Sequence, residues 1–199
     1  LRKDGGLHRA RDRGAVIFGV CAGFQILGRT IIERDGNELT ALGIIDVSSQ
    51  PLDGPRAIGE ILTECNVVPG GGRLTGFENH GFGTALGSGV LPLGRVIVGR
   101  GNGCGSGEEG AVDGSIVCTY LHGPALARNP SLTEFLLSLA GVSLSSDVHD
   151  QVSVLQDALH DASVARAVRE SESNGNSLMA RIWKSGIRGA SLPARGVDT

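Results

Sequence analysis

Two long, mostly apolar runs constrain the fold of this chain more than any other feature. They cover residues 15–20 and 115–121, with no charged residue in either. Such runs are typical of strands buried on both faces, as in a parallel sheet that helices cover. Residues 22–29 follow the first run and carry a helical pattern. With 32 glycines and only 4% aromatic residues, the composition favours a loop-rich α/β domain over a helical bundle.

The remaining segments predict a mixed α/β organisation. Short β-prone runs punctuated by glycine and proline are expected at residues 42–47, 56–65, 76–80 and 95–98, and residues 101–114 are predicted to be a glycine-rich loop. An amphipathic helix is expected at residues 131–140. The predicted organisation is one domain over residues 1–146, a C-terminal helix over 147–170 and a flexible tail over 171–199.

Composition excludes several functional classes. The formal net charge of −3 is too small to indicate a nucleic-acid partner. No run of about 18 apolar residues is present, so membrane insertion is not expected. The four cysteines show no C-x-x-C spacing, which argues against a metal site. Free thiols in a reducing cytoplasm are the simplest expectation.

A potential nucleophile lies where the first apolar run meets the predicted helix. Cys21 follows the run directly, between Gly19 and Gly23. A sharp strand-to-helix turn exposes the side chain at its apex and tolerates little bulk beside it. The helix amino end favours a thiolate, and the amide of Ala22 can donate to the oxyanion of a tetrahedral intermediate. Cys21 is therefore the predicted nucleophile. The other cysteines lack this context and are predicted to be structural: Cys65, Cys104 and Cys118.

A cysteine nucleophile needs a histidine within reach, and five are present. Three lie in polar helical stretches and are expected at the surface: His8, His149 and His160. His122 ends the second apolar run, so its ring should emerge at the carboxyl end of a strand, where α/β sites form. His80 shares a predicted strand face with Glu78; a structural pair and a functional pair both stay open, and His80 is left outside the catalytic set. His122 is the predicted base.

These segments resemble the class I glutamine amidotransferases. Residues 19–28 (GVCAGFQILG) are similar to the nucleophile motif of that superfamily. Residues 119–124 (TYLHGP), followed by Asn129-Pro130, resemble the catalytic-histidine segment of its CobB/CobQ-like branch. Residues 77–81 and 101–103 resemble the GatD-type glutaminase subunit of lipid II isoglutaminyl synthase. The resemblance implies a flavodoxin-like sheet flanked by helices.

The resemblance also implies a chemistry. The Cys21 thiolate would attack the side-chain amide of L-glutamine, His122 would protonate the departing ammonia, and water would hydrolyse the glutamyl thioester. Ammonia would pass to a Mur-ligase-like, ATP-using subunit of the MurT type, which amidates the D-glutamate of lipid II in peptidoglycan synthesis. Relatives hold glutamine with an arginine downstream of the nucleophile, and Arg56 matches it best. No cofactor is implied for this chain itself.

Two departures from the family pattern add further expectations. Many class I members have a glutamate two positions after the histidine, where this chain has Pro124, as the CobB/CobQ-like branch does. The next acidic residue is Glu134, so the orienting acid is expected from the partner subunit. Class I domains also place several strands before the nucleophile, whereas 20 residues precede Cys21 here. N-terminal strands and half of the oxyanion hole are therefore expected to be missing.

Two other functions stay open from the sequence. The chain could be the glutaminase domain of a cobyric or cobyrinic acid amidating enzyme, in which an ATP-binding synthetase domain precedes it. It could also be a degenerate, non-catalytic fragment, which a glutamine-mimicking electrophile would fail to label. The residues at Pro124 and Asn129-Pro130 favour the GatD type.

Overall fold

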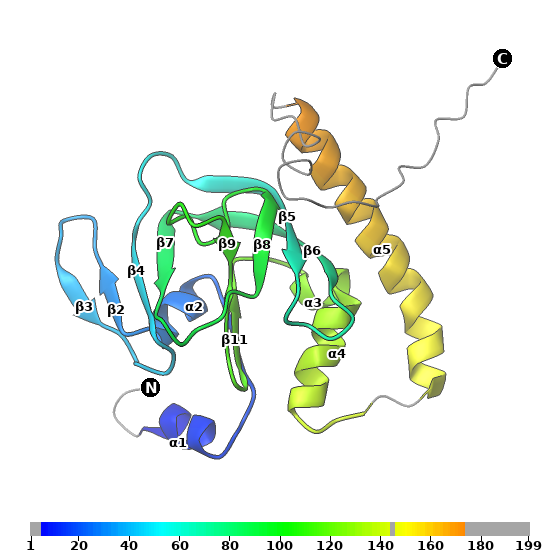
Figure 1. The fold of residues 1–199 in the computed structure, drawn as a ribbon, viewed down its shortest axis with the longest axis horizontal. Coiled ribbons are helices and arrows are strands. Elements are labelled where there is room, and N and C mark those ends of the chain that lie inside the picture. Colours follow the sequence, from blue (N-terminus) through cyan, green and yellow to red (C-terminus); the bar gives the residue numbers. More distant parts are fainter. Residues whose placement is uncertain (1–4, 144–145, 174–199) are drawn as a thin grey trace.

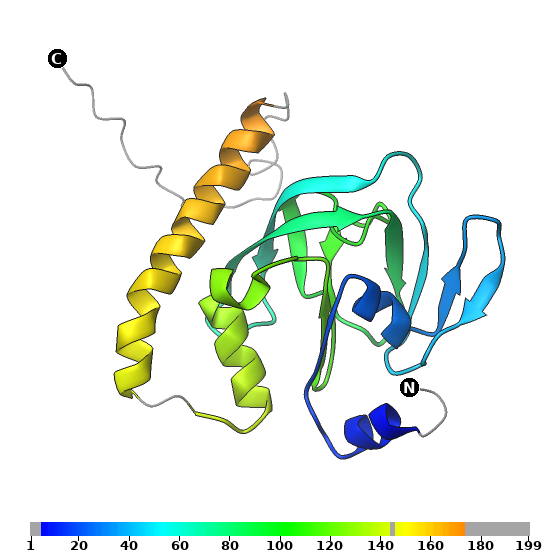
Figure 2. The ribbon, with the colours of Figure 1, turned by 180° about the vertical axis from the view of Figure 1, so that it is seen from behind.

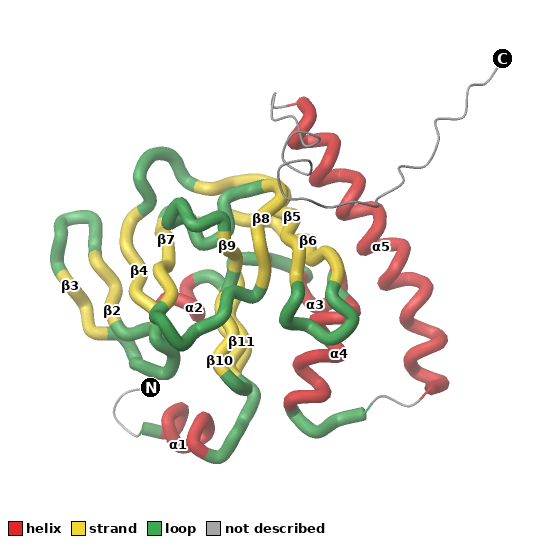
Figure 3. The backbone as a smooth tube through the Cα atoms, in the orientation of Figure 1, coloured by secondary structure: helices red, strands yellow, loops and turns green. Residues whose placement is uncertain are grey.

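The computed structural model of the protein describes residues 5–143 and 146–173. Three small β-sheets form the centre of the molecule, and helices flank them (Figures 1 and 3). The predicted α/β class is confirmed. Within the described ranges, no helix is long and apolar enough to cross a membrane.

The two apolar runs pair with each other in the first sheet, called sheet A. Its strand order is β1-β11-β10, formed by β1 (Ile17–Val20), β11 (Ile116–Thr119) and β10 (Ala111–Asp113). Strands β1 and β11 are parallel, with Val20 opposite Thr119. Alternate β11 residues enter two different apolar cores, Cys118 in one and Val117 in the other. Burial on both faces, predicted from the apolar runs, is thus confirmed for β11.

The other two sheets are mostly antiparallel. Sheet B has the order β3-β2-β4-β7, formed by β3 (Glu38–Thr40), β2 (Thr30–Ile32), β4 (Val47–Pro51) and β7 (Phe82–Leu86). Sheet C has the order β6-β5-β8-β9, formed by β6 (Gly72–His80), β5 (Ala57–Cys65), β8 (Gly94–Val98) and β9 (Glu108–Glu109). Gly81 alone separates β6 from β7, so the chain passes directly from sheet C to sheet B.

Five helices surround the sheets in the described part of the chain: α1 (Gly6–Asp12), α2 (Ala22–Leu27), α3 (Ala125–Arg128), α4 (Pro130–Leu139) and α5 (Ser146–Ser173). Helix α5 lies along one side of the molecule (Figure 1). Its Ala167 is fully buried in an apolar cluster with Leu62 and Ile97 of sheet C.

A buried carboxylate adds a polar link between α5 and the body. Glu60 of β5 forms ion pairs with Arg128 of α3 and, at 3.4 Å, with Arg166 of α5. Arg166 also pairs with Glu170 one turn further along the helix, at 3.1 Å. The carboxylate of Glu60 is thus neutralised by cations from two helices, which offsets the cost of its burial.

Several predicted elements are wrong or were missed. Residues 42–47 were expected to be a strand, but only Val47 of that run lies in one. Residues 101–114 contain β9 and β10, although a loop was predicted there. The β2–β3 hairpin was not predicted at all. Helix α5 continues to Ser173, so the first residues of the expected tail are helical, and residues 174–199 lie outside the described chain.

Candidate functional site

Cys21 lies at a sharp turn between β1 and α2, as predicted. Its backbone has φ 52° and ψ −110°, the one positive φ at a non-glycine residue in the described ranges. Hydrogen bonds hold the turn on both sides: the Cys21 amide donates to the Thr119 carbonyl (3.0 Å), and the Gln25 amide donates to the Cys21 carbonyl (3.2 Å). A side chain in this region costs about 1–3 kcal/mol, which the surrounding structure must offset.

The two glycines beside Cys21 have different roles. A β-carbon at Gly19 would lie 2.6 Å from Leu27 Cδ1 and 2.9 Å from Cys118 Sγ, so close packing of the strand under the helix requires glycine there. A β-carbon at Gly23 would meet no atom within 4 Å. The prediction that Gly23 excludes a larger side chain is therefore wrong, since no atom of this chain would contact one there. Gly23 borders open space beside the half-buried Cys21.

His122 is oriented by backbone carbonyls. It lies three residues beyond Thr119, and its backbone pairs with Phe77 of β6. The ring Nδ1 lies 2.9 Å from the Phe77 carbonyl oxygen and 3.0 Å from that of Tyr120. Because carbonyl oxygens only accept hydrogen bonds, Nδ1 must carry the hydrogen. In the neutral ring, Nε2 is then the unprotonated nitrogen that can take up a proton.

The predicted nucleophile and base emerge at the same sheet edge. Strands β1 and β11 are parallel neighbours, and Cys21 and His122 lie just beyond their carboxyl ends. Figure 2 shows the blue β1–α2 segment beside the green β11 that leads to α3. Both side chains are half-buried, so neither is enclosed by the core. This edge of sheet A is the candidate active site.

Tyr120 connects the two sides of this site. Its hydroxyl accepts a hydrogen bond from Gln25 Nε2 (3.1 Å) and shares another with Thr84 (2.8 Å). Its ring stacks on His80, with centroids 3.9 Å apart. Burial raises the pKa of Tyr120 to about 12, so the hydroxyl keeps its hydrogen at neutral pH. Sequence reasoning missed this residue, although a tyrosine within an apolar run beside the predicted base was a visible signal.

The Glu78–His80 pair has a structural role in the described chain. Both side chains are buried, with His80 Nε2 3.7 Å from Glu78 Oε2. The Glu78 carboxylate accepts hydrogen bonds from the backbone amides of Arg100 and Gly101. These contacts hold the loop after β8 against β6. Of the two roles left open by the sequence, they favour a structural role for the Glu78–His80 pair.

A second buried carboxylate supports the end of β11. Glu109 Oε1 accepts hydrogen bonds from the Thr119 hydroxyl and the Tyr120 amide, each at 2.7 Å. Burial is the main cause that raises the pKa of Glu109 from 4.5 to about 7, and the charge of Glu78 acts in the same direction. The folded state therefore holds this proton more tightly than the unfolded chain does, and this contribution to stability is lost as the pH rises from 4.5 to about 7.

We expect Glu109→Gln to remove that pH dependence, because an amide in place of the carboxyl group does not ionise. The free energy of unfolding, measured in urea at pH 5, 6, 7 and 8, should fall less steeply up to pH 7 in the variant than in the wild type. Parallel curves for the two proteins would show that Glu109 does not titrate in this window.

Arg56, the predicted substrate-binding residue, lies on the surface just before β5. Its Nη2 donates to Asn79 Oδ1 (2.9 Å) and to the Asn79 carbonyl oxygen (3.3 Å). Asn79 lies two residues beyond Phe77, which pairs with His122, or roughly 7 Å along β6. A glutamine molecule spans a comparable length between its side-chain amide and its α-carboxylate. In the described chain, no hydrogen bond joins Arg56 to Cys21 or His122 directly.

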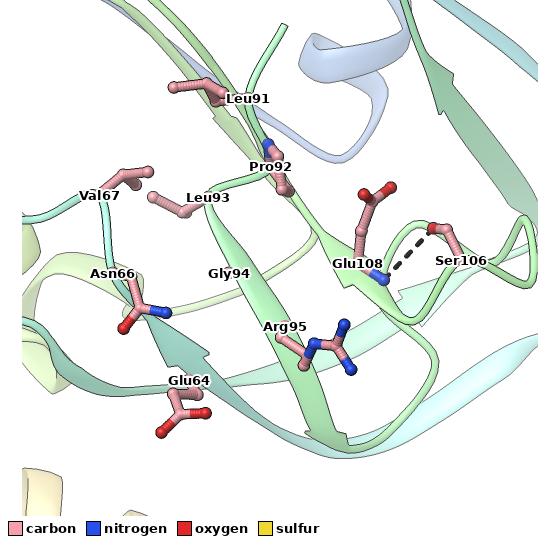
Figure 4. Close-up of a pocket in the computed structure, with 10 residues that line it drawn as sticks. All are labelled: Glu64, Asn66, Val67, Leu91, Pro92, Leu93, Gly94, Arg95, Ser106 and Glu108. Carbon is pink, nitrogen blue, oxygen red and sulfur yellow. Dashed lines mark hydrogen bonds between the residues drawn. The ribbon is translucent and has the colours of Figure 1, made fainter. Parts of the chain in front are cut away.

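Other concave surfaces do not carry comparable chemistry. The pocket in Figure 4 lies between the end of β5 and the β8–β9 edge and is lined by Glu64, Leu91, Arg95 and Glu108 among others. Its lining contains no cysteine or histidine. Over residues 5–143 and 146–173, no group of three histidine, cysteine, aspartate or glutamate side chains is placed to hold a metal ion.

Comparison with known proteins adds independent information. Residues 2–130 match the model of the CobB/CobQ-like glutamine amidotransferase domain. The chain is 37% identical over 134 residues to the lipid II isoglutaminyl synthase (glutamine-hydrolyzing) subunit GatD of Staphylococcus aureus, covering 67% of this chain and 53% of that protein. It is 32% identical over 139 residues to cobyric acid synthase of Sphingopyxis alaskensis, covering 66% of this chain and 26% of that protein.

The fold has a counterpart among solved structures. A crystal structure of a glutamine amidotransferase aligns with a TM-score of 0.53 and 23% sequence identity, over 68% of this chain and 67% of that one. This likeness confirms the fold predicted from the sequence. The chain spans about half the length of the GatD relative, 53% of it.

Proposed function

Because this chain belongs to the CobB/CobQ-like glutamine amidotransferase family, we propose that it hydrolyses L-glutamine with Cys21 as nucleophile and His122 as base. The strained backbone of Cys21 carries this proposal. A cysteine that only fills space gains nothing from a φ of 52°, whereas a nucleophile needs the exposure that this turn provides. The oriented ring of His122 at the same sheet edge supports it.

The geometry suggests how the residues divide the chemistry. His122 Nε2 takes the thiol proton while the sulfur of Cys21 attacks the side-chain amide carbon of glutamine. The first amide groups of a helix have no carbonyl partner within it, so the Ala22 amide is suited to bind the resulting oxyanion. His122 then gives the proton to the departing nitrogen, which leaves as ammonia. Water hydrolyses the remaining glutamyl thioester, and Arg56 holds the α-carboxylate of glutamine throughout.

The proposed acceptor of ammonia is a MurT-type, Mur-ligase-like partner subunit that uses ATP to amidate the D-glutamate of lipid II. The name of the S. aureus relative, a subunit of lipid II isoglutaminyl synthase, supports this assignment. This chain is proposed to need no cofactor of its own and to act in the cytoplasm, in keeping with its four free thiols. The carbonyls of Phe77 and Tyr120 already orient His122, and the partner is proposed to add the acidic group.

The glutaminase domain of a cobyric acid synthase is the second candidate. The 32% identity to the S. alaskensis enzyme favours it, and the glutamine chemistry would be the same. The two candidates differ in the acceptor, so only the receiving enzyme separates them. Ammonia transfer to lipid II in the presence of a MurT-type ligase would establish the first.

The proposed hydrolysis is tested with a glutamine-mimicking diazoketone that retains the α-amino acid group. We expect one adduct on the full chain, located at Cys21 by peptide mass spectrometry, with the exposed Cys104 unmodified. Ammonia release from glutamine should be low for the chain alone and rise when the ligase partner is added. An unlabelled Cys21 would favour the non-catalytic alternative, and full activity of the isolated chain would contradict an acid donated by the partner.

A further inference from the structure

Two arginine side chains from distant parts of the sequence converge on Gly81. Arg34 lies in the turn between β2 and β3, and Arg56 lies just before β5. A β-carbon built at Gly81 would lie 3.2 Å from Arg34 Nη2 and 3.3 Å from Arg56 Nη1. Both guanidinium groups therefore approach one point above the backbone at Gly81. The two oxygens of one carboxylate, each bonded at about 2.7–2.9 Å, can bridge such a pair.

In the part of the chain that the structure describes, no acidic side chain forms an ion pair with either arginine. The hydrogen bonds of Arg56 go to the Asn79 carbonyl and side-chain amide oxygens. No ion pair is recorded for Arg34, whereas nearby Arg29 pairs with Asp46 at 2.7 Å. Two like charges this close repel each other, and a bound anion offsets that repulsion because it attracts both. The guanidinium fork is also the side chain best matched to a carboxylate.

Hydrogen bonds and strand β6 connect the arginine pair to the candidate base. Arg56 bonds to Asn79, and two residues back along β6 is Phe77, whose carbonyl oxygen lies 2.9 Å from His122 Nδ1. Strand geometry sets this offset at roughly 7 Å. Arg56 reaches from Gly81 back to Asn79, so an anion that it shares with Arg34 lies roughly 7–13 Å along the strand from Phe77. The anionic group of free glutamine is its α-carboxylate.

We propose that Arg34 is a second substrate-binding arginine, which shares the α-carboxylate of glutamine with Arg56. The inference rests on the proposed glutaminase function and adds a residue from the β2–β3 hairpin to its site. Arg34 selects for free glutamine over neutral amides and takes no part in bond breaking. Its loss should weaken reactions of carboxylate-bearing reagents at Cys21 and leave those of neutral reagents unchanged.

The test compares two reagents for Cys21 on the full chain: the diazoketone, which carries the α-carboxylate, and iodoacetamide, which is neutral. Arg34→Gln should lower the second-order rate of Cys21 labelling by the diazoketone by about tenfold to a hundredfold, the range expected for a lost charge-assisted hydrogen bond. The iodoacetamide rate at Cys21 should stay within about twofold of the wild type, since no charge recognition is involved. Arg34→Lys should give an intermediate diazoketone rate, because a lysine keeps the charge but not the fork.

Arg29→Gln is the matched control, because Arg29 precedes the same hairpin but pairs with Asp46. In this variant, Cys21 should react with both reagents at the wild-type rate. An unchanged diazoketone rate in Arg34→Gln would overturn the inference and leave Arg56 as the only carboxylate ligand of the pair. Equal losses with both reagents would also overturn it, since Arg34 would then support the fold. Failure of the wild type to react with the diazoketone, while reacting with iodoacetamide, would instead reject the proposed function.

Discussion

Replacing Cys21 by alanine is expected to abolish glutamine hydrolysis, with a loss of about 10⁴- to 10⁶-fold, the range seen when a nucleophile is removed from a catalytic unit. Alanine cannot form the thioester, and the turn that presents the side chain stays in place. Ammonia release from glutamine, measured with the ligase partner present, checks this. Cys104→Ser is the matched control, because Cys104 is exposed and should not contribute. Residual activity near the wild-type level in Cys21→Ala would remove the nucleophile from the proposal.

Replacing Cys21 by glycine should be equally inactive but more stable. At φ 52° every side chain is strained, and glycine is not. The relief of about 1–3 kcal/mol exceeds the entropic cost of glycine, about 0.5–1 kcal/mol, so a gain of about 1 kcal/mol in unfolding free energy is expected. Urea denaturation measures it. A glycine variant less stable than the wild type would show that the turn stores no strain.

The second large effect is expected at His122. His122→Ala should lower the rate of glutamine hydrolysis by about 10²- to 10⁴-fold, the usual contribution of a general base, with little change in KM. The same variant leaves the carbonyl oxygens of Phe77 and Tyr120 without the ring Nδ1 donor. The Phe77 carbonyl keeps the His122 backbone amide as a donor (3.0 Å), so we expect a loss of about 1 kcal/mol of stability, the usual net value of a hydrogen bond.

His122→Asn separates these two effects. The asparagine side-chain amide can place its nitrogen near the Nδ1 position and donate to the same carbonyls, but it has no basic atom. It should therefore be as inactive as alanine and closer to the wild type in stability. His8→Gln, which lies outside the site, should retain activity. A rate above about a tenth of the wild type in both His122 variants would exclude His122 as the base.

The elements that hold the candidate site were predictable because their signals are local. The pairing partners β1 and β11 lie in the apolar runs at residues 15–20 and 115–121, and Cys21 and His122 directly follow these runs. The orientation of His122 was not predictable, since it depends on the carbonyl of Phe77, 45 residues away in sequence. The meeting of Arg34 and Arg56 over Gly81 likewise depends on tertiary structure alone.

The missed elements are short and form only through their neighbours. Strands β2 and β3 have three residues each, too few for a two-residue periodicity to show, and the Asp35-Gly36 turn signal between them went unused. Strands β9 and β10 lie in a glycine-rich stretch, where Gly110 adopts φ 66° and the chain turns from one strand to the other. Strand β9 forms by pairing with β8, and strand β10 forms by pairing with β11. A local sequence pattern does not reveal such pairing.

Helix α5 covers one side of the molecule. It seals the outer side of sheet C, where Leu62 and Ile97 contact Ala167. A protein that contacted sheet C itself on that side would have to displace the helix, which exposes these apolar side chains to water and separates Glu60 from Arg166. The helix also borders the segment that follows the candidate base, because its Ser163 and Arg166 line one pocket with Pro124. A molecule that approaches His122 from that side therefore meets α5 first.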